Sequence, residues 1–163
     1  MTEEMPTYIG CKMIKAKPMT LGEYRGYRGL DMGKDESTGT EGYLVEYPDS
    51  NSNHENHEGY VSWSPREVFE SAYLKLSDPT KITPDLVEDF VHTVEVSKDG
   101  NHTVCHGYAI NGMSFIESSA CVDPKKYDEN TGREIACRKM ADRSIWPGLG
   151  FVLAWAKNGI NNK

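Results

Sequence analysis

The dipeptide Asn111-Gly112 constrains the fold more than any other feature of this chain, because it separates two runs in which apolar and polar residues alternate. Asn-Gly between alternating runs is the strongest short-range signal for a β-hairpin. With a two-residue loop, Tyr108 pairs with Phe115 and His106 pairs with Glu117. The sequence therefore predicts a hairpin that carries these four side chains on one face of a sheet.

A third strand precedes this hairpin, because Lys98-Asp99-Gly100-Asn101 is a further turn signal. Residues 92–122 are thus predicted to form a three-stranded antiparallel meander. Small residues in a strand permit close approach, so the opposite face is suited to packing by a helix or a ligand. The residues of that face are Thr103, Cys105, Gly107 and Ala109.

The N-terminal half is predicted to contain a second group of strands, over residues 8–17, 42–47 and 60–63. The next residues, Ser64-Pro65-Arg66-Glu67, have the pattern of a helix start. Ser would be the N-cap, Pro suits the first helical position, and Glu completes a capping box.

Two helices are predicted at the C-terminus. Asp128 is the expected N-cap of the first, over residues 129–144. Pro147-Gly148 is expected to break it, and residues 149–157 are expected to form a second, strongly apolar helix.

These elements predict an α+β fold, with an antiparallel β-sheet from N-terminal and central strands and helices at the C-terminus. We expect a single domain over residues 1–163. It would consist of an N-terminal β/helix module (1–77) and a β-meander with C-terminal helices (84–163).

Charge and hydropathy exclude several classes of protein. The formal net charge is −7, which argues against a protein that coats a nucleic-acid polymer through counterion release. No apolar run approaches the roughly 18 residues of a membrane span. The acidic N-terminus lacks the apolar stretch of a signal peptide, so we expect a cytoplasmic protein. A hydrophobic share of 37% makes self-association attractive as a source of further burial.

A metal site is not expected. The four cysteines include no C-x-x-C pair, so buried reduced thiols are the simpler interpretation. The segment His54-Glu55-Asn56-His57-Glu58 resembles a metal motif, but it lies in a polar stretch without apolar anchors. We interpret it as a solvated hairpin loop.

Three groups of residues are candidates for ligand binding. Tyr108 and Phe115, beside His106 and Glu117, would form an aromatic platform for a nucleobase, although an ordinary core pair has the same pattern. Trp63 and Arg66 lie at a strand-to-helix junction, where anions bind. The alternative there is a core Trp63 and a surface Arg66.

The third group is the basic set of the first C-terminal helix: Arg133, Arg138, Lys139 and Arg143. Guanidinium groups match phosphate oxygens, so at least one arginine is a candidate anion ligand. Pairing between Glu134 and Arg138 is the alternative. At about 100° per residue, Lys139 and Arg143 lie on one side of the helix and Arg138 on another.

Two sets of motifs resemble those of phage proteins. Residues 19–24, 27–29, 41–49 and 62–65 are similar to a recurrent module of small phage proteins. Residues 117–124, 127–128 and 132–136 resemble a widespread family of small tailed-phage proteins. Joined in one chain, they resemble the phage Thoeris anti-defence proteins of the first kind. The chain departs from that pattern at residues 50–58, which resemble an insertion, and at Met113, where an aromatic residue is usual.

This resemblance implies a sponge: a protein that binds cyclic ADP-ribose isomers made by bacterial TIR enzymes and sequesters them without cleavage. It implies dimers or hexamers in the cytoplasm of the infected bacterial host, and some relatives bind cyclic oligonucleotides. It requires no cofactor, metal or catalytic residue. The expected ligand-binding residues are Phe115, Arg133, Arg138, Asp123, Arg66, Trp63 and Arg143. Asp123 comes from the family-like motif, and a turn or cap role is its alternative.

Two other functions stay open. The acidic surface would suit an interaction protein that occupies a basic host defence protein. A nucleotide-acting hydrolase would use His106 and Glu117 as general acid and base, which requires both groups near the reacting atom.

Overall fold

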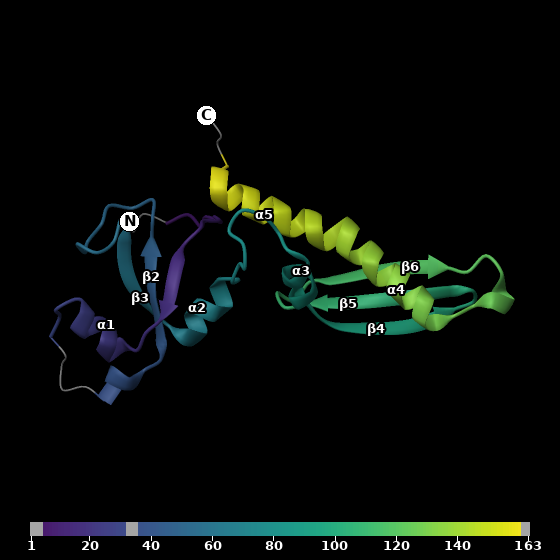
Figure 1. The fold of residues 1–163 in the computed structure, drawn as a ribbon, viewed down its shortest axis with the longest axis horizontal. Coiled ribbons are helices and arrows are strands. Elements are labelled where there is room, and N and C mark those ends of the chain that lie inside the picture. The colour runs from purple at the N-terminus through teal and green to yellow at the C-terminus, as the bar shows by residue number, and fades with distance from the viewer. Residues whose placement is uncertain (1–4, 32–35, 161–163) are drawn as a thin grey trace. The chain divides into compact units, whose positions relative to one another are not determined.

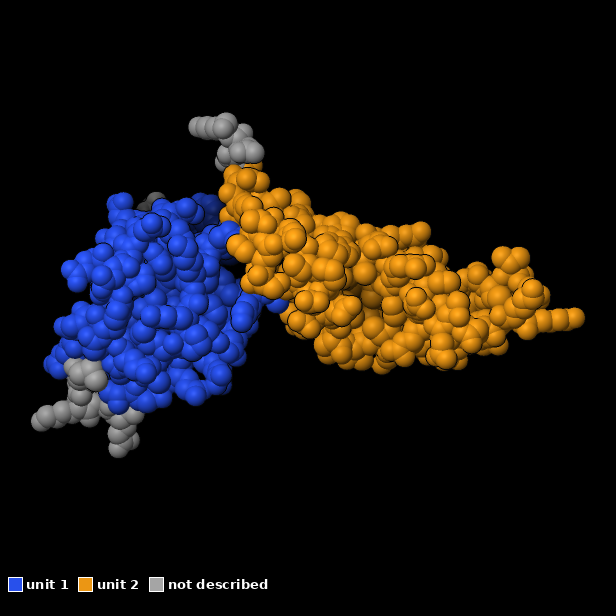
Figure 2. Space-filling model, viewed as in Figure 1, with its two compact units in different colours: residues 1–75 blue, residues 76–163 orange. Residues whose placement is uncertain are grey.

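The computed structural model describes residues 5–31 and 36–160. The chain forms two compact units, Met1–Lys75 and Leu76–Lys163, which Figure 2 colours separately. Each unit has its own three-stranded antiparallel sheet with helices, so the predicted α+β class is confirmed. In the described ranges, no helix combines the length and apolar character needed to cross a bilayer.

Unit 1 is built on a sheet of order β1-β2-β3 (Figure 1). Its elements are β1 (Lys15–Pro18), α1 (Leu21–Tyr27), a 3₁₀ turn (Glu36–Gly39), β2 (Gly42–Tyr47), β3 (Tyr60–Pro65) and α2 (Arg66–Ala72). The expected second and third strands are confirmed. The first strand, β1, is shorter than predicted. Its register pairs Lys15 with Glu46 and Pro18 with Tyr43, so β1 already pairs with most of the residues of β2.

The two helices of unit 1 begin differently from each other. Thr20 and Glu23 form a capping box at α1: the Glu23 amide donates to Thr20 Oγ1 (3.3 Å) and the Thr20 amide donates to Glu23 Oε2 (2.8 Å). The capping box predicted at Ser64 is wrong. Ser64 pairs with Tyr43 in the β2–β3 ladder, and α2 begins two residues later, at Arg66.

Unit 2 begins with a short helix, whose N-cap Thr83 accepts from the Leu86 amide. The three strands of the predicted meander follow, in the order β4-β5-β6. The elements are α3 (Pro84–Phe90), β4 (Val91–Asp99), β5 (His102–Ala109), β6 (Ser114–Ala120), a 3₁₀ turn (Pro124–Lys126), α4 (Glu129–Met140), a π-helical turn (Ala141–Ile145) and α5 (Trp146–Asn158).

The β5–β6 hairpin is confirmed, but its predicted register is wrong by one residue. The Ala109 amide donates to the Met113 carbonyl (2.8 Å), which leaves a three-residue loop from Ile110 to Gly112. Gly112 has a φ of +84°, and no non-glycine residue in the described ranges has a positive φ. A two-residue type I′ turn needs positive φ at both central residues, whereas a three-residue loop needs it only at the last. Asn111-Gly112 therefore ends the turn and does not occupy its centre.

This shift moves the residues of β6 to the other face. Gly107 now lies opposite Phe115, and Cys105 lies opposite Glu117. Tyr108 instead pairs with Ser114, and His106 with Ile116. Because neighbouring residues of a strand point to opposite faces, the expected Tyr108–Phe115 platform and the expected His106–Glu117 pair do not form.

Helix α4 packs on the small-residue face of the sheet, for which the sequence predicted either a helix or a ligand. Its buried residues Gly132, Ala136 and Met140 are spaced at i, i+4 and i+8 and so form one stripe. A Cβ atom at Gly132 would lie 2.0 Å from Thr103 Oγ1, so the backbone of α4 contacts the Thr103 side chain of β5 directly. Ser119 Oγ donates to the Gly132 carbonyl (2.7 Å) and fixes the helix against β6.

The helix break predicted at Pro147-Gly148 is wrong. Helix α4 continues through the π turn into α5, and Figure 1 shows one long rod in unit 2. Pro147 lies in the first turn of α5, where a missing amide hydrogen is tolerated, and the π turn lies directly before it. Ile145 of the π turn and Leu149 of α5 join Leu86 and Val87 of α3 in a second core cluster.

Replacement of Gly132 by alanine should destabilise unit 2. The added methyl would overlap Thr103, which is 1% exposed and cannot move away. We expect a loss of about 1–3 kcal/mol in the free energy of unfolding, typical of overpacking. Chemical denaturation of both proteins measures it.

Gly148→Ala is the matched control in the same rod, because a Cβ there would meet no described atom within 4 Å. It should leave stability unchanged or raise it by up to about 1 kcal/mol. Equal stability of G132A and the wild type would contradict the close contact between α4 and β5.

Candidate functional site

The seven predicted ligand residues divide between the two units. Trp63 and Arg66 belong to unit 1. The other five belong to unit 2: Phe115, Asp123, Arg133, Arg138 and Arg143.

Three arginines of unit 2 lie on the rod formed by α4 and the π turn. Arg133 and Arg138 are exposed, and among the described residues neither has a carboxylate partner within ion-pair distance. Arg143 lies 3.6 Å from Glu117 Oε2 and keeps 63% of its side chain exposed. At about 100° per residue, side chains five residues apart point about 140° apart. Arg133 and Arg138, which both lie within α4, therefore point in different directions in one copy.

Phe115 and Asp123 make local structural contacts. The sequence alone did not show whether these two residues have a structural role or a binding role. Phe115 is partly buried and packs against both core clusters of unit 2. Asp123 caps the 3₁₀ turn that follows β6, where its Oδ1 accepts from the Lys125 amide (3.1 Å). Phe115 thus has the contacts of a core residue and Asp123 those of a cap, which are the alternatives to ligand binding at these positions.

The open face of the same sheet carries the side chains of His106 and Tyr108. Tyr108 Oη donates to Glu95 Oε2 and lies 3.1 Å from His106 Nδ1. His106 Nε2 is buried with no hydrogen-bond partner among the described residues. Glu117 is on the opposite face, so the acid–base pair of the hydrolase alternative is not assembled.

In unit 1, Arg66 lines a cavity of about 180 Å³ together with Glu41, Tyr43 and Met19. Its guanidinium is paired with Glu41 and with Glu70, whose Oε1 lies 3.2 Å from Arg66 Nε. The hydrogen bond to Glu70 and the charge of Glu41 raise the pKa of Arg66. A phosphate would have to displace two carboxylates, so the structure does not prepare Arg66 for an anion.

Trp63 contacts two residues that line this cavity, Met19 and Gly42. Its indole Nε1 donates to the Met19 carbonyl (2.8 Å), and its ring packs on Gly42, where a Cβ would lie 2.4 Å from the ring. The contact explains why glycine begins β2. Trp63 is partly buried, and these contacts are those of a packing residue.

The Cys105 thiol of unit 2 is buried beside a second thiol. Cys105 is fully buried, and its Sγ lies 4.0 Å from Cys137 Sγ. Burial, with a smaller contribution from Cys137, raises the pKa of Cys105 to about 11. The thiol is therefore protonated at neutral pH. Among the described residues, no group of three or more His, Cys, Asp or Glu side chains is arranged to hold a metal ion.

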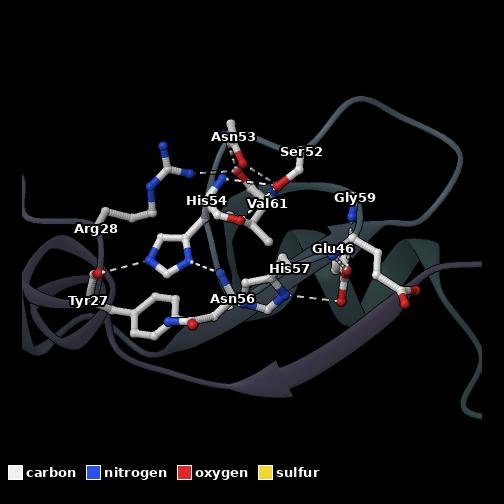
Figure 3. A network of polar contacts seen from close by, with 11 residues as sticks. Tyr27, Arg28, Glu46, Ser52, Asn53, His54, Asn56, His57, Gly59 and Val61 are labelled. Atoms are coloured by element: carbon white, nitrogen blue, oxygen red, sulfur yellow. Dashed lines mark hydrogen bonds and ion pairs between the residues drawn. The ribbon is translucent and has the colours of Figure 1, made fainter.

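A polar network in unit 1 was not expected from the sequence (Figure 3). It fixes residues 54–58, for which the sequence predicts a solvated hairpin loop. Asn53 binds both backbone groups of Val61, through Nδ2 (3.0 Å) and Oδ1 (2.8 Å). The His54 ring stacks on Tyr27 with 4.5 Å between ring centroids.

Glu46 and His57 form the buried part of this network. Glu46 Oε2 lies 3.1 Å from His57 Nδ1, and its Oε1 accepts from the amides of Glu58 and Gly59, each at 3.1 Å. These bonds to His57 and Gly59 lower the pKa of Glu46, so the carboxylate is ionised at neutral pH although it is only 8% exposed. His57 Nε2 in turn lies 3.0 Å from the Tyr27 hydroxyl.

One sequence signal pointed to this network. Glu46 interrupts the apolar and aromatic run of residues 42–47, and a buried carboxylate in a central strand needs hydrogen-bonded partners. The histidines eight and eleven residues later were the available partners. The sequence did not identify these partners, because it was searched for apolar anchors, whereas hydrogen bonds hold this loop.

Glu46→Gln should lower the melting temperature at neutral pH, because it removes the charge that binds His57 and the two amides. The folded-state pKa of Glu46 is below its ordinary value of 4.5, so its stabilising effect is present above that value. It is lost as the pH falls through the lowered pKa. The difference in melting temperature between wild type and variant should therefore vanish in acid.

Glu55→Gln is the control, since Glu55 is an exposed residue of the same loop. Thermal unfolding from pH 7 to pH 2 compares the three proteins. A difference between wild type and E46Q that persists unchanged to the lowest pH would contradict the role assigned to the Glu46 carboxylate.

Comparison with known proteins gives one match. No curated protein and no solved structure matches the chain significantly. Residues 78–156 match the model of a family described as phage protein (N4 Gp49/phage Sf6 gene 66). The matched segment lies within unit 2 and contains its whole sheet, α4 and most of α5. The match supports the assignment of this chain as a phage protein.

Proposed function

We propose that this phage protein binds a small cyclic nucleotide immune signal in the infected host cytoplasm and sequesters it without cleavage. Cyclic ADP-ribose isomers are the expected ligands. The observation that carries the proposal is the pair of exposed arginines on α4, Arg133 and Arg138. They have no carboxylate partner within the described ranges, in a chain with 25 Asp and Glu residues. The family match covers the unit that holds them.

The chemistry of this ligand suits the two arginines. A cyclic ADP-ribose isomer carries a diphosphate, and guanidinium forks bind phosphate oxygens with two parallel hydrogen bonds. Arg143 is a weaker donor, because Glu117 already shares its charge. Sequestration requires binding alone, so the proposed function needs no catalytic residue and no cofactor.

Self-association would bring more than one arginine to each ligand, and helix α5 offers the surface for it. The segment from Trp146 to Ala156 contains no charged residue. Within it, Phe151 is 68% exposed and Val152 is 47% exposed. Two copies of a chain with a net charge of −7 repel each other except where they meet through uncharged surface. We therefore expect a homo-oligomer, a dimer or a hexamer, in which α5 of one copy packs on α5 of another.

Arg133→Ala and Arg138→Ala should each weaken ligand binding about tenfold or more, since each removes a hydrogen bond between charged groups. The purified protein is incubated with a cyclic ADP-ribose isomer, the free ligand is filtered off, and the protein is then boiled. The wild type should deplete the filtrate and release intact ligand on boiling. Lys126→Ala, which removes an exposed cation outside α4, is the control.

Other outcomes of this experiment identify the alternatives. Depletion with no intact ligand after boiling would show an enzyme. A filtrate that is never depleted would contradict the proposal and favour an acidic protein that occupies a host partner.

Phe151→Asp should dissociate the oligomer, because a carboxylate buried between two helices has no partner there. Sedimentation velocity should show a lower mass for F151D than for the wild type. Asn158→Asp adds the same charge beyond the apolar segment and should leave the mass unchanged. A wild type that sediments as a monomer would refute the proposed role of α5.

A further inference from the structure

The cavity in unit 1 lies where β1 ends and where α1, β2 and α2 begin. Pro18 is the last residue of β1, Gly42 the first of β2 and Arg66 the first of α2, and all three line the cavity. Backbone hydrogen bonds join these segments. The Met19 amide donates to the Gly42 carbonyl (2.9 Å), and the Arg66 amide donates to the Glu41 carbonyl (3.1 Å). The cavity is therefore built into the folded unit.

The charged side chains that line this cavity, among the described residues, are those of Glu23, Glu41 and Arg66. Arg66 is paired with Glu41 and also with Glu70, so its positive charge is already shared between two carboxylates. Glu23 adds a further negative charge. The cavity thus has an excess of negative charge, which attracts a cation and repels a phosphate.

Each of the two lining carboxylates keeps one oxygen without a hydrogen-bond donor in the described part of the chain. Glu23 Oε2 accepts from the amide (2.8 Å) and the hydroxyl (2.9 Å) of Thr20, and these bonds lower the pKa of Glu23. Glu41 Oε2 is paired with Arg66. Because an ionised carboxylate accepts through both oxygens, the two Oε1 atoms are available to the donors of a ligand.

The remaining wall of the cavity suits a short apolar stem. Pro18, Met19 and Tyr43 are its apolar and aromatic residues. The Tyr43 ring stacks on Phe69 with 4.1 Å between centroids, and its hydroxyl donates to Glu70 (2.8 Å), so the ring is fixed. The volume is about 180 Å³. Since a protein cavity of about 150 Å³ holds benzene, this one has room for about six to eight non-hydrogen atoms.

We propose that this cavity binds a small aliphatic diamine. One ammonium group binds the Glu23 carboxylate, the other binds the Glu41 carboxylate, and the methylene stem between them contacts Met19 and Tyr43. Alkylammonium groups are charged at neutral pH, as the side chain of lysine is. The site uses residues of unit 1 alone and does not depend on ligand binding by α4.

The test is isothermal titration calorimetry of the full chain with 1,4-diaminobutane, which has six non-hydrogen atoms. The wild type should bind one equivalent per chain, and added sodium chloride should weaken binding through screening. 1,4-Butanediol has the same stem without charge and should not bind. Glu23→Gln and Glu41→Gln should each weaken binding about threefold to fivefold, the usual effect of one exposed ion pair. Glutamine also completes a capping box, so E23Q keeps the start of α1.

Glu67→Gln is the matched control. Glu67 is an exposed residue in the first turn of α2 that does not line the cavity, so E67Q changes the net charge equally. It should bind the diamine as the wild type does. Circular dichroism verifies that each variant is folded. Three results would each overturn the proposal: a folded wild type without saturable binding of the diamine, butanediol bound as tightly as the diamine, or E67Q weakened as much as E23Q and E41Q.

Discussion

The contact between α4 and the sheet of unit 2 is the constraint on which that unit depends. Gly132 and Ala136 bring the helix backbone close to Thr103 and Cys105, and both of these strand residues are almost fully buried. Small residues on both sides permit this approach. The same contact determines which way the arginines point, because the stripe that faces the sheet leaves the remaining positions of α4 to solvent. Packing inside the unit therefore sets the direction of its cations.

The sequence predicted the elements of this unit better than their alignment. The alternation along β5 and β6 was sufficient to place the hairpin, and Asp128 was sufficient to place the start of α4. The sequence did not determine the register of the hairpin, because Asn-Gly is compatible both with the centre of a two-residue loop and with the end of a three-residue loop. The three-residue loop places Phe115 on the core side of the sheet, whereas a two-residue loop would place it on the open face. The predicted helix break at Pro147 is wrong for a related reason. A proline breaks a helix from its interior but is tolerated in a first turn, where Pro147 lies.

Unit 1 shows a different limit of sequence patterns. The apolar pattern placed β2 and β3 but assigned the segment between them to solvent. Its actual anchors are Asn53, His54 and His57, which bind Val61, Tyr27 and Glu46. These partners lie 8, 27 and 11 residues away along the chain, which is beyond the short repeats that identify helices and strands, so the apolar pattern alone does not reveal the pairing. For Arg66, the partner Glu41 comes from before β2, whereas Glu70 lies four residues later on the same helix, at the spacing at which helical ion pairs form.

The π turn between α4 and α5 holds one more residue per turn than the helices on either side of it. A π turn of this kind is equivalent to the insertion of one amino acid into an α-helix. Deletion of a single residue from Ala141–Ile145 would restore uniform α-helical winding, and because the wide turn absorbs its extra residue, the side chains of α5 would keep nearly the direction they have now. Leu149 would therefore stay against Leu86 and Val87 of α3. The gain or loss of one codon at this turn thus leaves both the packed core and the apolar surface of α5 in place.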